Sequence, residues 1–437
     1  MSSRQALPRS VEVTIERLSH EGRGVAHVDG KTLFVADALP GERVEVRITR
    51  RHRRFDEGVT EHVLAADPTR VDPRCPHAAA CGGCSLQHLA PAAQVAHKES
   101  VLLELLRHQA NARPVRVLPA ITGPVWGYRR RARLSVREVH KKGRVLIGFR
   151  EKSSHYVAEI TRCDVLTPDV GHRLEALHAL VESLDIRAQI PQIEIAADDH
   201  HTLVLIRHLV PVEAPDRARL RAFEEDTGLR VHLQSGAAQD STPLGEPVAL
   251  SYAVDDLRFA FRPGDFVQVN AAINQQLVAH AVALLAPEPH ERVLDLFCGL
   301  GNFTLPVARR AGHVLGLEGE AGLVARARAN AAANGCANAL FDTADLASPE
   351  GAARAARECW DRVLLDPPRS GAEQVLKALD LAATRRVVYV SCNPVTLARD
   401  TAILVRDRGF TLGAAGVIDM FPHTAHVESI AVFDRRR

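Results

Sequence analysis

The sequence of 437 residues is poor in aromatic side chains, in cysteine and in long apolar runs. Aromatic residues make up only 4%, which argues against an extended base-stacking sheet of the RNA-recognition-motif kind. Eight cysteines are too few for a disulfide scaffold in a chain of this length. No apolar run reaches the roughly 18 residues of a membrane span, and residues 1–11 lack the apolar core of a signal peptide. We therefore expect a cytoplasmic protein whose cysteines are reduced thiols, metal ligands or catalysts.

The charge balance is also unremarkable when it is taken over the whole chain. There are 55 basic and 53 acidic residues, a net charge of +2, which argues against a wholly basic nucleic-acid coat. Hydrophobic residues at 46% and charged residues at 25% are typical of globular proteins. At about 150 residues per domain, the length predicts two to four domains.

The N-terminal residues, 1–66, show the alternation of short β-strands. Apolar and polar residues alternate over 11–16 and 43–48, with glycine-containing turns between them. About five short strands in this length predict a small barrel of the oligonucleotide-binding type. The basic run at 50–54 suits phosphate contact, and it suits a solvated hairpin tip equally well.

Two further regions differ in their pattern. From 67 to 265, a linker and a helical stretch at about 92–109 precede alternating strands that surround one helix near 172–184, which predicts an α+β domain. From 266 to 437, buried-looking strand runs such as 292–296 and 386–390 alternate with helical segments. Parallel strands that are covered on both faces have this pattern, so we predict a doubly wound, Rossmann-like α/β domain at the C-terminus.

A glycine-containing turn follows Asp295 at the end of a predicted strand. Gly299 and Gly301 let the backbone approach a ligand at a helix N-terminus. A dinucleotide site would have a third glycine where Thr304 stands, and Asp295 would repel a pyrophosphate. The same acid suits the ammonium group of S-adenosylmethionine, and Glu318, at the end of the next strand, suits its ribose hydroxyls. The turn therefore favours an adenosylmethionine site over a plain strand-to-helix connection.

Three more reactive side chains stand at strand ends. Asp366 precedes two prolines, Cys392 follows an apolar strand, and Glu428 precedes one. Uracil C5 is a weak nucleophile, but a thiolate that adds to C6 makes C5 an enolate carbon able to attack a methyl group. A base must then remove the C5 proton before the thiolate leaves. Considered alone, Cys392 is best interpreted as a packing residue and Glu428 as a solvated charge. Their placement at strand ends favours this chemistry instead.

These segments resemble the signatures of the RNA uracil-5-methyltransferases. Residues 391–394 (Ser-Cys-Asn-Pro) resemble the nucleophile signature of that family. Residues 365–369 (Leu-Asp-Pro-Pro-Arg) and 426–428 (His-Val-Glu) resemble two further signatures, and 295–303 resembles the cofactor loop. The resemblance extends over most of the chain.

The resemblance implies roles for particular residues. Cys392 would be the nucleophile, and Glu428 the base that removes the C5 proton. At position 345 the family often has Asn where this chain has Asp; either side chain is able to accept a hydrogen bond from the adenine amine. The residues implied around S-adenosylmethionine are Gln268, Phe297, Asn302, Glu318, Asp345 and Asp366, beside Asp295, Gly299 and Gly301 of the turn.

Four other cysteines form a separate group. Cys75, Cys81 and Cys84 fall within ten residues, and Cys163 is a distant fourth. Four thiolates bind zinc or an iron–sulfur cluster; the single Cys-x2-Cys pair favours a cluster, and an unligated loop is the third possibility. The resemblance strengthens the [4Fe-4S] interpretation, because members that act on large-subunit ribosomal RNA carry this cysteine set and an N-terminal TRAM domain. The transfer-RNA members carry neither.

A basic stretch lies between residues 113 and 152. It holds twelve Lys or Arg and two Glu, a local charge of +10. Trp126 and Tyr128 precede its arginine triplet, and we expect them to offer stacking surfaces to unpaired bases. A solvated basic hairpin is the alternative, which the size of the local excess disfavours.

Residues and resemblance together predict an enzyme that methylates C5 of a uridine in 23S ribosomal RNA, of the uracil 1939 type, through Cys392 and Glu428. The target base would be flipped out of a loop into the C-terminal crevice, because C6 is inaccessible in a stacked base. We expect a monomer with no membrane partner. Two alternatives stay open: a transfer-RNA uracil-5-methyltransferase without iron, and a non-catalytic RNA-binding protein that holds adenosylmethionine or a metal structurally.

Overall fold

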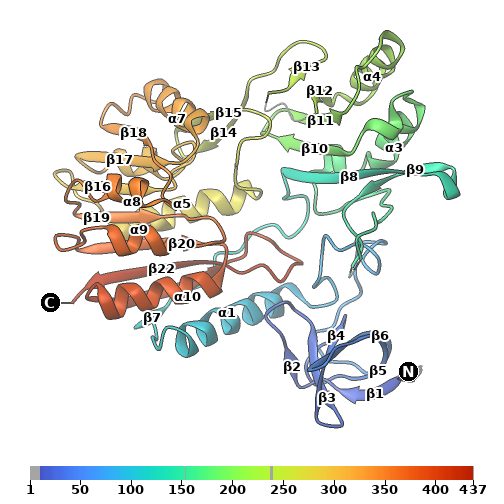
Figure 1. Cartoon of the computed structure of the whole chain (residues 1–437), viewed down its shortest axis with the longest axis horizontal. Coiled ribbons are helices and arrows are strands. Elements are labelled where there is room, and N and C mark those ends of the chain that lie inside the picture. The colour runs from blue at the N-terminus through green and yellow to red at the C-terminus, as the bar shows by residue number, and fades with distance from the viewer. Residues whose placement is uncertain (1–9, 153, 237–239, 437) are drawn as a thin grey trace.

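The computed structural model describes residues 10–152, 154–236 and 240–436, and it contains a small N-terminal sheet, a central sheet and a larger C-terminal sheet (Figure 1). The N-terminal sheet (blue) and the central sheet (green) lie on the same side of the C-terminal region (yellow to red). In the described part of the chain, no helix is both long and apolar enough to cross a membrane.

The N-terminal sheet has six strands in the order β1-β5-β6-β4-β3-β2. Alternate residues, including Val13, Leu33 and Val46, face a shared apolar core, as the period-two pattern predicts. The basic run at 50–54 forms the exposed end of the β5–β6 hairpin. The strands are β1 Val11–Thr14, β2 Arg17–Leu18, β3 Gly24–Val28, β4 Lys31–Ala36, β5 Arg43–Arg51 and β6 Phe55–Ala65.

The central sheet has the order β13-β12-β11-β10-β8-β9, and α3 and α4 pack on it. The predicted helix near 172–184 is α3, but α4 was not predicted, because only Asp216, Leu220 and Phe223 of its fourteen residues are buried. The elements are β8 Arg131–Val139, β9 Arg144–Gly148, α2 Pro168–Gly171, α3 Leu174–Ser183, β10 Gln192–Ala197, β11 Thr202–His208, α4 Ala214–Thr227, β12 Arg230–Ser235 and β13 Thr242–Pro243.

The C-terminal sheet has the order β18-β17-β16-β19-β20-β22-β21-β7, in which β18 to β20 are parallel and β22 is antiparallel. Helices cover both faces, as predicted for a doubly wound domain, and the runs at 292–296 and 386–390 are β16 and β20. The strands are β16 Arg292–Leu296, β17 His313–Glu318, β18 Ala339–Thr343, β19 Arg362–Leu365, β20 Arg386–Ser391, β21 Phe410–Ile418 and β22 Glu428–Arg435. The helices are α5 Ala271–Leu285, α6 Thr304–Ala308, α7 Ala321–Ala333, α8 Pro349–Ala355, α9 Glu373–Ala378 and α10 Pro394–Ala402.

Two segments that the sequence pattern assigns to the central domain pack against the C-terminal sheet. Helix α1 (Pro91–His108) buries Leu102 and Leu106 in one of the two C-terminal cores, and β7 (Arg116–Val117) pairs with β21. The hairpin of β14 (Leu250–Val254) and β15 (Leu257–Phe261) packs on the other face. The predicted central domain, 67–265, therefore contains segments that pack on the C-terminal sheet, because the chain enters the C-terminal core both before and after the central sheet.

Candidate active site

The structure brings the predicted cofactor residues of the C-terminal domain to one edge of its sheet. Parallel strands end at a common edge, which is where open α/β sheets bind ligands. Asp295 lies near the end of β16, and the glycine turn follows that strand. Glu318 is the last residue of β17, and Asp345 comes shortly after β18. Asp366 follows β19, and Cys392 follows β20.

The pairing of two neighbouring strands places the predicted nucleophile and base side by side. Strands β20 and β22 are antiparallel, with Ser391 opposite Ser429 in the register. Cys392 directly follows Ser391 and Glu428 directly precedes Ser429, so the two residues are neighbours just beyond the last pair of this register. Glu428 is buried and Cys392 is half-buried at the wall of a cavity. The thiol and the carboxyl group therefore lie close together although 36 positions separate them in the sequence, and the Glu428 carboxylate acts on the pKa of the thiol.

Burial and neighbouring acids disfavour ionisation of both groups. Burial, together with the nearby Glu428 and Asp366 carboxylates, raises the pKa of the Cys392 thiol to about 12. Burial also raises the pKa of Glu428 well above its usual value, and Asp366 adds to the effect. The Arg369 guanidinium acts in the opposite direction on both groups. Arg369 belongs to the 365–369 signature, but the sequence analysis did not predict that its positive charge would act on Cys392 and Glu428.

The glycine turn requires unusual backbone conformations. Phe297, Gly299 and Gly301 have positive φ angles of 63°, 55° and 90°. A Cβ atom at Gly301 would lie 3.2 Å from the ring of Phe341. The N–H of Gly299 donates a hydrogen bond to Glu318 Oε2 at 3.1 Å, so the predicted ribose-binding acid also ties the turn to β17.

Asp295 has one carboxylate oxygen that lacks a partner. Its Oδ2 atom accepts a hydrogen bond from the Thr304 hydroxyl at 2.5 Å. Its Oδ1 atom is buried and has no hydrogen-bond partner among the described residues. Burial raises the pKa of Asp295 to about 7, and the Asp366 and Glu318 carboxylates contribute. A buried acceptor without a partner is costly, so this atom fits a ligand that brings a donor or a positive charge.

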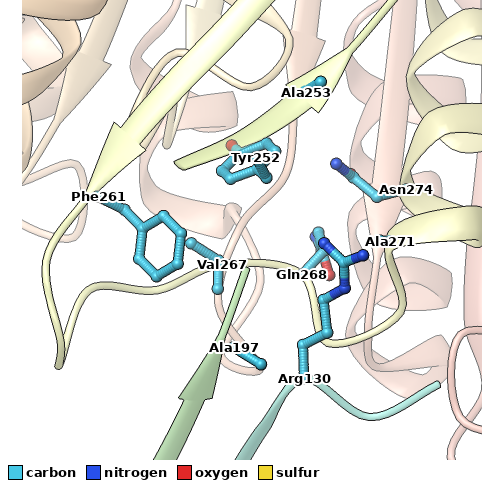
Figure 2. A pocket seen from close by; sticks show the side chains of 9 residues that line it. All are labelled: Arg130, Ala197, Tyr252, Ala253, Phe261, Val267, Gln268, Ala271 and Asn274. Carbon is cyan, nitrogen blue, oxygen red and sulfur yellow. The ribbon is translucent and has the colours of Figure 1, made fainter. Parts of the chain in front are cut away.

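Gln268 lines a pocket of about 330 Å³ between the central and C-terminal regions (Figure 2). Arg130, Tyr252 and Asn274 line the same pocket. Two of these residues fix the side chain of Asn302. The oxygen of Asn302 accepts hydrogen bonds from the Tyr252 hydroxyl at 3.1 Å and from Asn274 Nδ2 at 3.0 Å.

The hydrogen bonds of Asn302 also determine which of its amide atoms is free to bind a ligand. Asn302 Nδ2 donates to Asn274 Oδ1 at 3.0 Å, and its second N–H has no acceptor among the described residues. Asn302 is therefore oriented to donate a hydrogen bond. Tyr252 and Asn274 were missed in the sequence, because β14 and α5 carry no motif that marks them.

An open cavity of about 1100 Å³ lies above Cys392 and is built from distant parts of the chain. The sequence analysis did not predict that the N-terminal sheet and the cysteine-rich loop would lie at this site. The lining residues are His20 and Glu21 of the β2–β3 turn, Gly82, Gly83 and Ser85, Val101 and Leu105 of α1, Arg369, Cys392, Asn393, Pro394, Val395 and the four residues Thr424, Ala425, His426 and Val427.

The four cysteines outside the C-terminal domain line a second cavity, of about 360 Å³. Cys75, Cys81, Cys84 and Cys163 share it with apolar side chains. Burial raises the pKa of the Cys84 thiol to about 11 and that of Cys163 to about 12. In residues 10–152, 154–236 and 240–436, no group of three or more Cys, His, Asp or Glu side chains forms a site for a single metal ion.

The prediction that Trp126 and Tyr128 offer stacking surfaces to RNA is wrong for Tyr128. For Trp126, contacts within the protein already occupy much of the ring. Tyr128 is buried and donates a hydrogen bond to the carbonyl oxygen of Pro422 at 3.0 Å. Trp126 stacks on His423 with ring centroids 3.9 Å apart, and the Arg74 guanidinium lies over its ring. Both rings serve contacts within the protein.

Much of the +10 stretch is neutralised by acids from elsewhere in the chain. Arg130 pairs with Asp199, Arg133 with Glu194, Arg144 with Glu159 and Lys152 with Asp37, at distances of 2.6 to 2.8 Å. The stretch is therefore not one basic surface. Its exposed members with no acidic partner among the described residues are Arg113, Arg116, Arg137, Lys141 and Arg150.

Comparison with known proteins shows similarity over the whole chain. The family model described as tRNA (uracil-5-)-methyltransferase matches residues 91–436, and a TRAM domain model matches residues 9–59. A protein of Alkalilimnicola ehrlichii named as a 23S rRNA (uracil(1939)-C(5))-methyltransferase is 53% identical over 437 residues, covering 99% of this chain and 98% of its own length. A Stenotrophomonas maltophilia protein of the same name is 50% identical, and 99% of each chain is covered.

A solved structure has a similar fold. The tRNA (uracil-54, C5)-methyltransferase of Pyrococcus abyssi, in complex with S-adenosyl-L-homocysteine, matches with a TM-score of 0.74 at 24% sequence identity. The match covers 97% of this chain and 100% of that chain.

Proposed function

Because this chain belongs to the tRNA (uracil-5-)-methyltransferase family, we propose that it transfers a methyl group from S-adenosylmethionine to C5 of uracil 1939 in 23S ribosomal RNA. One observation supports the mechanism: Ser391 pairs with Ser429, so the adjoining residues Cys392 and Glu428 come close together at the carboxyl edge of the sheet, and the Glu428 carboxylate acts on the pKa of the thiol. A nucleophile and a base close together at one site are what addition at C6 and proton removal at C5 require.

The reaction balances with these two side chains. The Cys392 thiolate adds to C6, a C–S bond forms, and the electrons of the C5–C6 double bond pass to C5 and the O4 carbonyl. C5 then attacks the methyl group and S-adenosylhomocysteine leaves. Glu428 takes the proton from C5, the C5–C6 double bond forms again, and the C–S bond breaks to return the thiolate. The raised pKa of Glu428 favours this role, because its carboxylate is a stronger base than a solvated one.

Electrostatics support a cationic methyl donor. Burial raises the pKa values of Asp295 and Asp366 to about 7, and that of Glu428 lies well above normal. The ammonium and sulfonium charges of S-adenosylmethionine would relieve the repulsion among these acids, and the ammonium group would supply the donor that Asp295 Oδ1 lacks. The residues we assign to the cofactor are Gln268, Asp295, Phe297, Gly299, Gly301, Asn302, Glu318, Asp345 and Asp366.

We assign a [4Fe-4S] cluster to the cavity lined by Cys75, Cys81, Cys84 and Cys163. Four thiols around one small cavity fit the group. Each of the four thiolates would bind one iron atom of the cluster. When bound, the cluster supplies a fixed anchor for the four thiolates. Visible absorbance with matching iron and sulfide content is expected, and zinc alone would contradict the assignment.

The RNA would enter through the cavity above Cys392, with the target base flipped out of its loop. Cys392 is half-buried at the cavity wall, so C6 of a stacked base would not reach it. His20 and Glu21 of the TRAM domain line the same cavity, so this domain would contact RNA close to the target. We further propose that the enzyme acts as a monomer, and a ribosomal RNA substrate places the reaction in the cytoplasm.

The function is tested with labelled S-adenosylmethionine and short transcripts. A 23S fragment that contains uracil 1939 should accept one methyl group, and the same fragment with cytosine at that position should accept none. A transfer-RNA transcript is the third substrate. Methylation of the transfer RNA and not of the ribosomal fragment would overturn the assignment in favour of a transfer-RNA enzyme.

A further inference from the structure

The loop between β21 and β22, residues 419–427, leads directly into Glu428, and we call it the base loop. We propose that Ser85, the residue after Cys84, is a positioning residue for Glu428 and acts by holding the base loop. This inference rests on the proposed function, because it takes Glu428 as the base. Ser85 would contribute to proton removal without touching the reacting atoms.

The segment of Ser85 and Leu86 holds the base loop by hydrogen bonds that run in both directions. The N–H groups of Ser85 and Leu86 both donate to the carbonyl oxygen of His423, each at 2.9 Å. In return, the N–H of Ala425 donates to the Ser85 hydroxyl oxygen at 3.0 Å. The two segments are 338 positions apart in the sequence, from 85 to 423, and these bonds join them directly.

Further contacts fix the neighbouring part of the base loop. The buried side chain of Gln94 accepts a hydrogen bond from the N–H of His423 at 2.7 Å and donates to the Leu86 carbonyl oxygen at 3.0 Å. Gln94 thus bridges both partners of the contact. The buried Lys98 ammonium donates to Asp419 at 2.6 Å and to the carbonyl oxygen of Phe421 at 3.0 Å. The beginning and the middle of the base loop are therefore attached to α1 and to the segment before it.

The contact from Ser85 reaches Ala425, three residues before Glu428, and the next residue, His426, lies within 3.3 Å of the Arg369 guanidinium. His423 has a positive φ of 66°, a conformation that a histidine rarely adopts without support. After Ala425, His426 and Val427 line the cavity, and Glu428 then pairs with Ile418 at the start of β22. A shift of Ala425 therefore moves the residues that aim Glu428 at C5. Proton transfer is sensitive to such shifts, because donor and acceptor must lie within hydrogen-bond reach.

The same bonds give the four-cysteine cavity a physical link to the active site. Cys84 lines that cavity, and Ser85 lines the cavity above Cys392. One peptide bond joins the two residues. The proposal thus assigns a positioning task to the segment that the cysteines hold, with no electron transfer.

Proton removal has a signature that separates it from RNA binding and from folding. If it slows, the methylated Cys392–C6 adduct accumulates on ordinary RNA, and deuterium at C5 slows turnover further. We expect Ser85→Ala to lower kcat about three- to tenfold, the size of one lost hydrogen bond, with little change in KM for RNA. The adduct should accumulate, and the deuterium isotope effect on kcat should rise.

The experiment compares five forms of the full-length protein with matched iron content. They are the wild type, Ser85→Ala, Ser85→Thr, which keeps the hydroxyl group, Glu428→Gln as the reference for failed proton removal, and Ser183→Ala as a control. Ser183 bonds only locally, to the Leu180 carbonyl oxygen on α3. Adduct is measured by denaturing gel, and kcat is measured with protium and deuterium at C5.

The proposal expects adduct in Glu428→Gln and Ser85→Ala, near-normal turnover in Ser85→Thr, and no change in Ser183→Ala. If Ser85→Ala raises KM for RNA with an unchanged isotope effect, or lowers only the melting temperature, the positioning role is overturned and the proposed function stands. If Glu428→Gln itself accumulates no adduct, Glu428 is not the base and the proposed mechanism fails first.

Discussion

The carboxyl edge of the C-terminal sheet and the base loop serve the same reaction but are assembled in different ways. At the edge, Asp295, Asp366 and Cys392 each belong to the end of their own strand, and the parallel order of the sheet brings them together. The base loop is held instead by partners such as Gln94, 329 positions away from His423. The strand ends therefore bring the reactive groups together, whereas the exact position of the catalytic base depends on long-range contacts.

The two regions also differ in how well their polar groups are satisfied. The edge keeps Asp295 Oδ1 buried without a partner and raises the pKa values of three acids. In the base loop, Lys98 pairs with Asp419, and Ser85 and Gln94 bond the backbone around His423, so its charged and backbone groups are paired although His423 Nε2 is buried without a partner among the described residues. Unsatisfied groups are typical of ligand sites, and satisfied networks are typical of supports. Substitutions should therefore affect chemistry in the first region and stability or placement in the second.

The largest effect is expected at the edge, from Cys392→Ala. Loss of the nucleophile should reduce methyl transfer by roughly 10⁴-fold or more, because no other group forms the bond to C6. The melting temperature should change little, since Cys392 is only half-buried. Transfer of labelled methyl groups to the 23S fragment measures the first effect, and circular dichroism measures the second. Retained activity would mean that the chemistry does not depend on this edge.

In the support region, Lys98→Met should mainly reduce stability. Removing one partner of a buried ion pair leaves Asp419 with an uncompensated charge, which costs about 3–5 kcal/mol of unfolding free energy. The double variant Lys98→Met with Asp419→Leu should recover much of the loss. Thermal and urea unfolding of the two variants test this. An unchanged melting temperature in the single variant would contradict the support role.

The fold and the edge could be predicted from the sequence because their signals are local. A buried strand that ends in or is followed by an acid, a thiol or glycines is recognisable within about ten residues. Asp295 lies near the end of such a strand, and Asp366 and Cys392 follow one. The family signatures added Gln268 and Asn302, which composition and periodicity did not mark. Spacing grouped Cys75, Cys81 and Cys84, and the resemblance supported Cys163 as the distant fourth; the structure has all four around one cavity.

The rest depends on contacts that no local pattern records. Trp126 and Tyr128 looked like stacking surfaces because their partners, His423 and Pro422, lie about 300 positions further on. The basic stretch looked unpaired for the same reason. Helix α4 was missed because its buried side is narrow and its other positions are charged. Tyr252, which orients Asn302, lies on a hairpin that the pattern gave to another domain.

At the edge, activity should increase with pH. The pKa of Cys392 is raised to about 12, so the thiol is almost fully protonated near neutral pH, and the thiolate fraction grows about tenfold per pH unit. Deprotonation of Glu428, whose pKa is also raised, acts in the same direction on proton removal. We expect kcat/KM for RNA to rise between about pH 7 and about pH 9 without a plateau. RNA affinity measured at each pH is the control, and a plateau below about pH 8 would contradict the high thiol pKa.

The smallest effect is expected from Tyr252→Phe, which removes one hydrogen bond to the Asn302 oxygen. The amide would lose part of its fixed orientation, so KM for S-adenosylmethionine should rise about two- to tenfold while kcat changes little. Tyr156→Phe, at an exposed side chain in the central region, is a matched control. Equal KM values in the two variants would show that Asn302 does not need this support.

The most direct test of the account uses RNA with 5-fluorouridine at the target position. Fluorine does not leave C5 as a proton does, so the methylated adduct stays bound to the protein. Mass spectrometry of the digested complex should place the RNA on the peptide that contains Cys392, together with one methyl group from S-adenosylmethionine. A complex through another cysteine, or no covalent complex at all, would contradict the assignment of Cys392 and Glu428 as the nucleophile and base of one site.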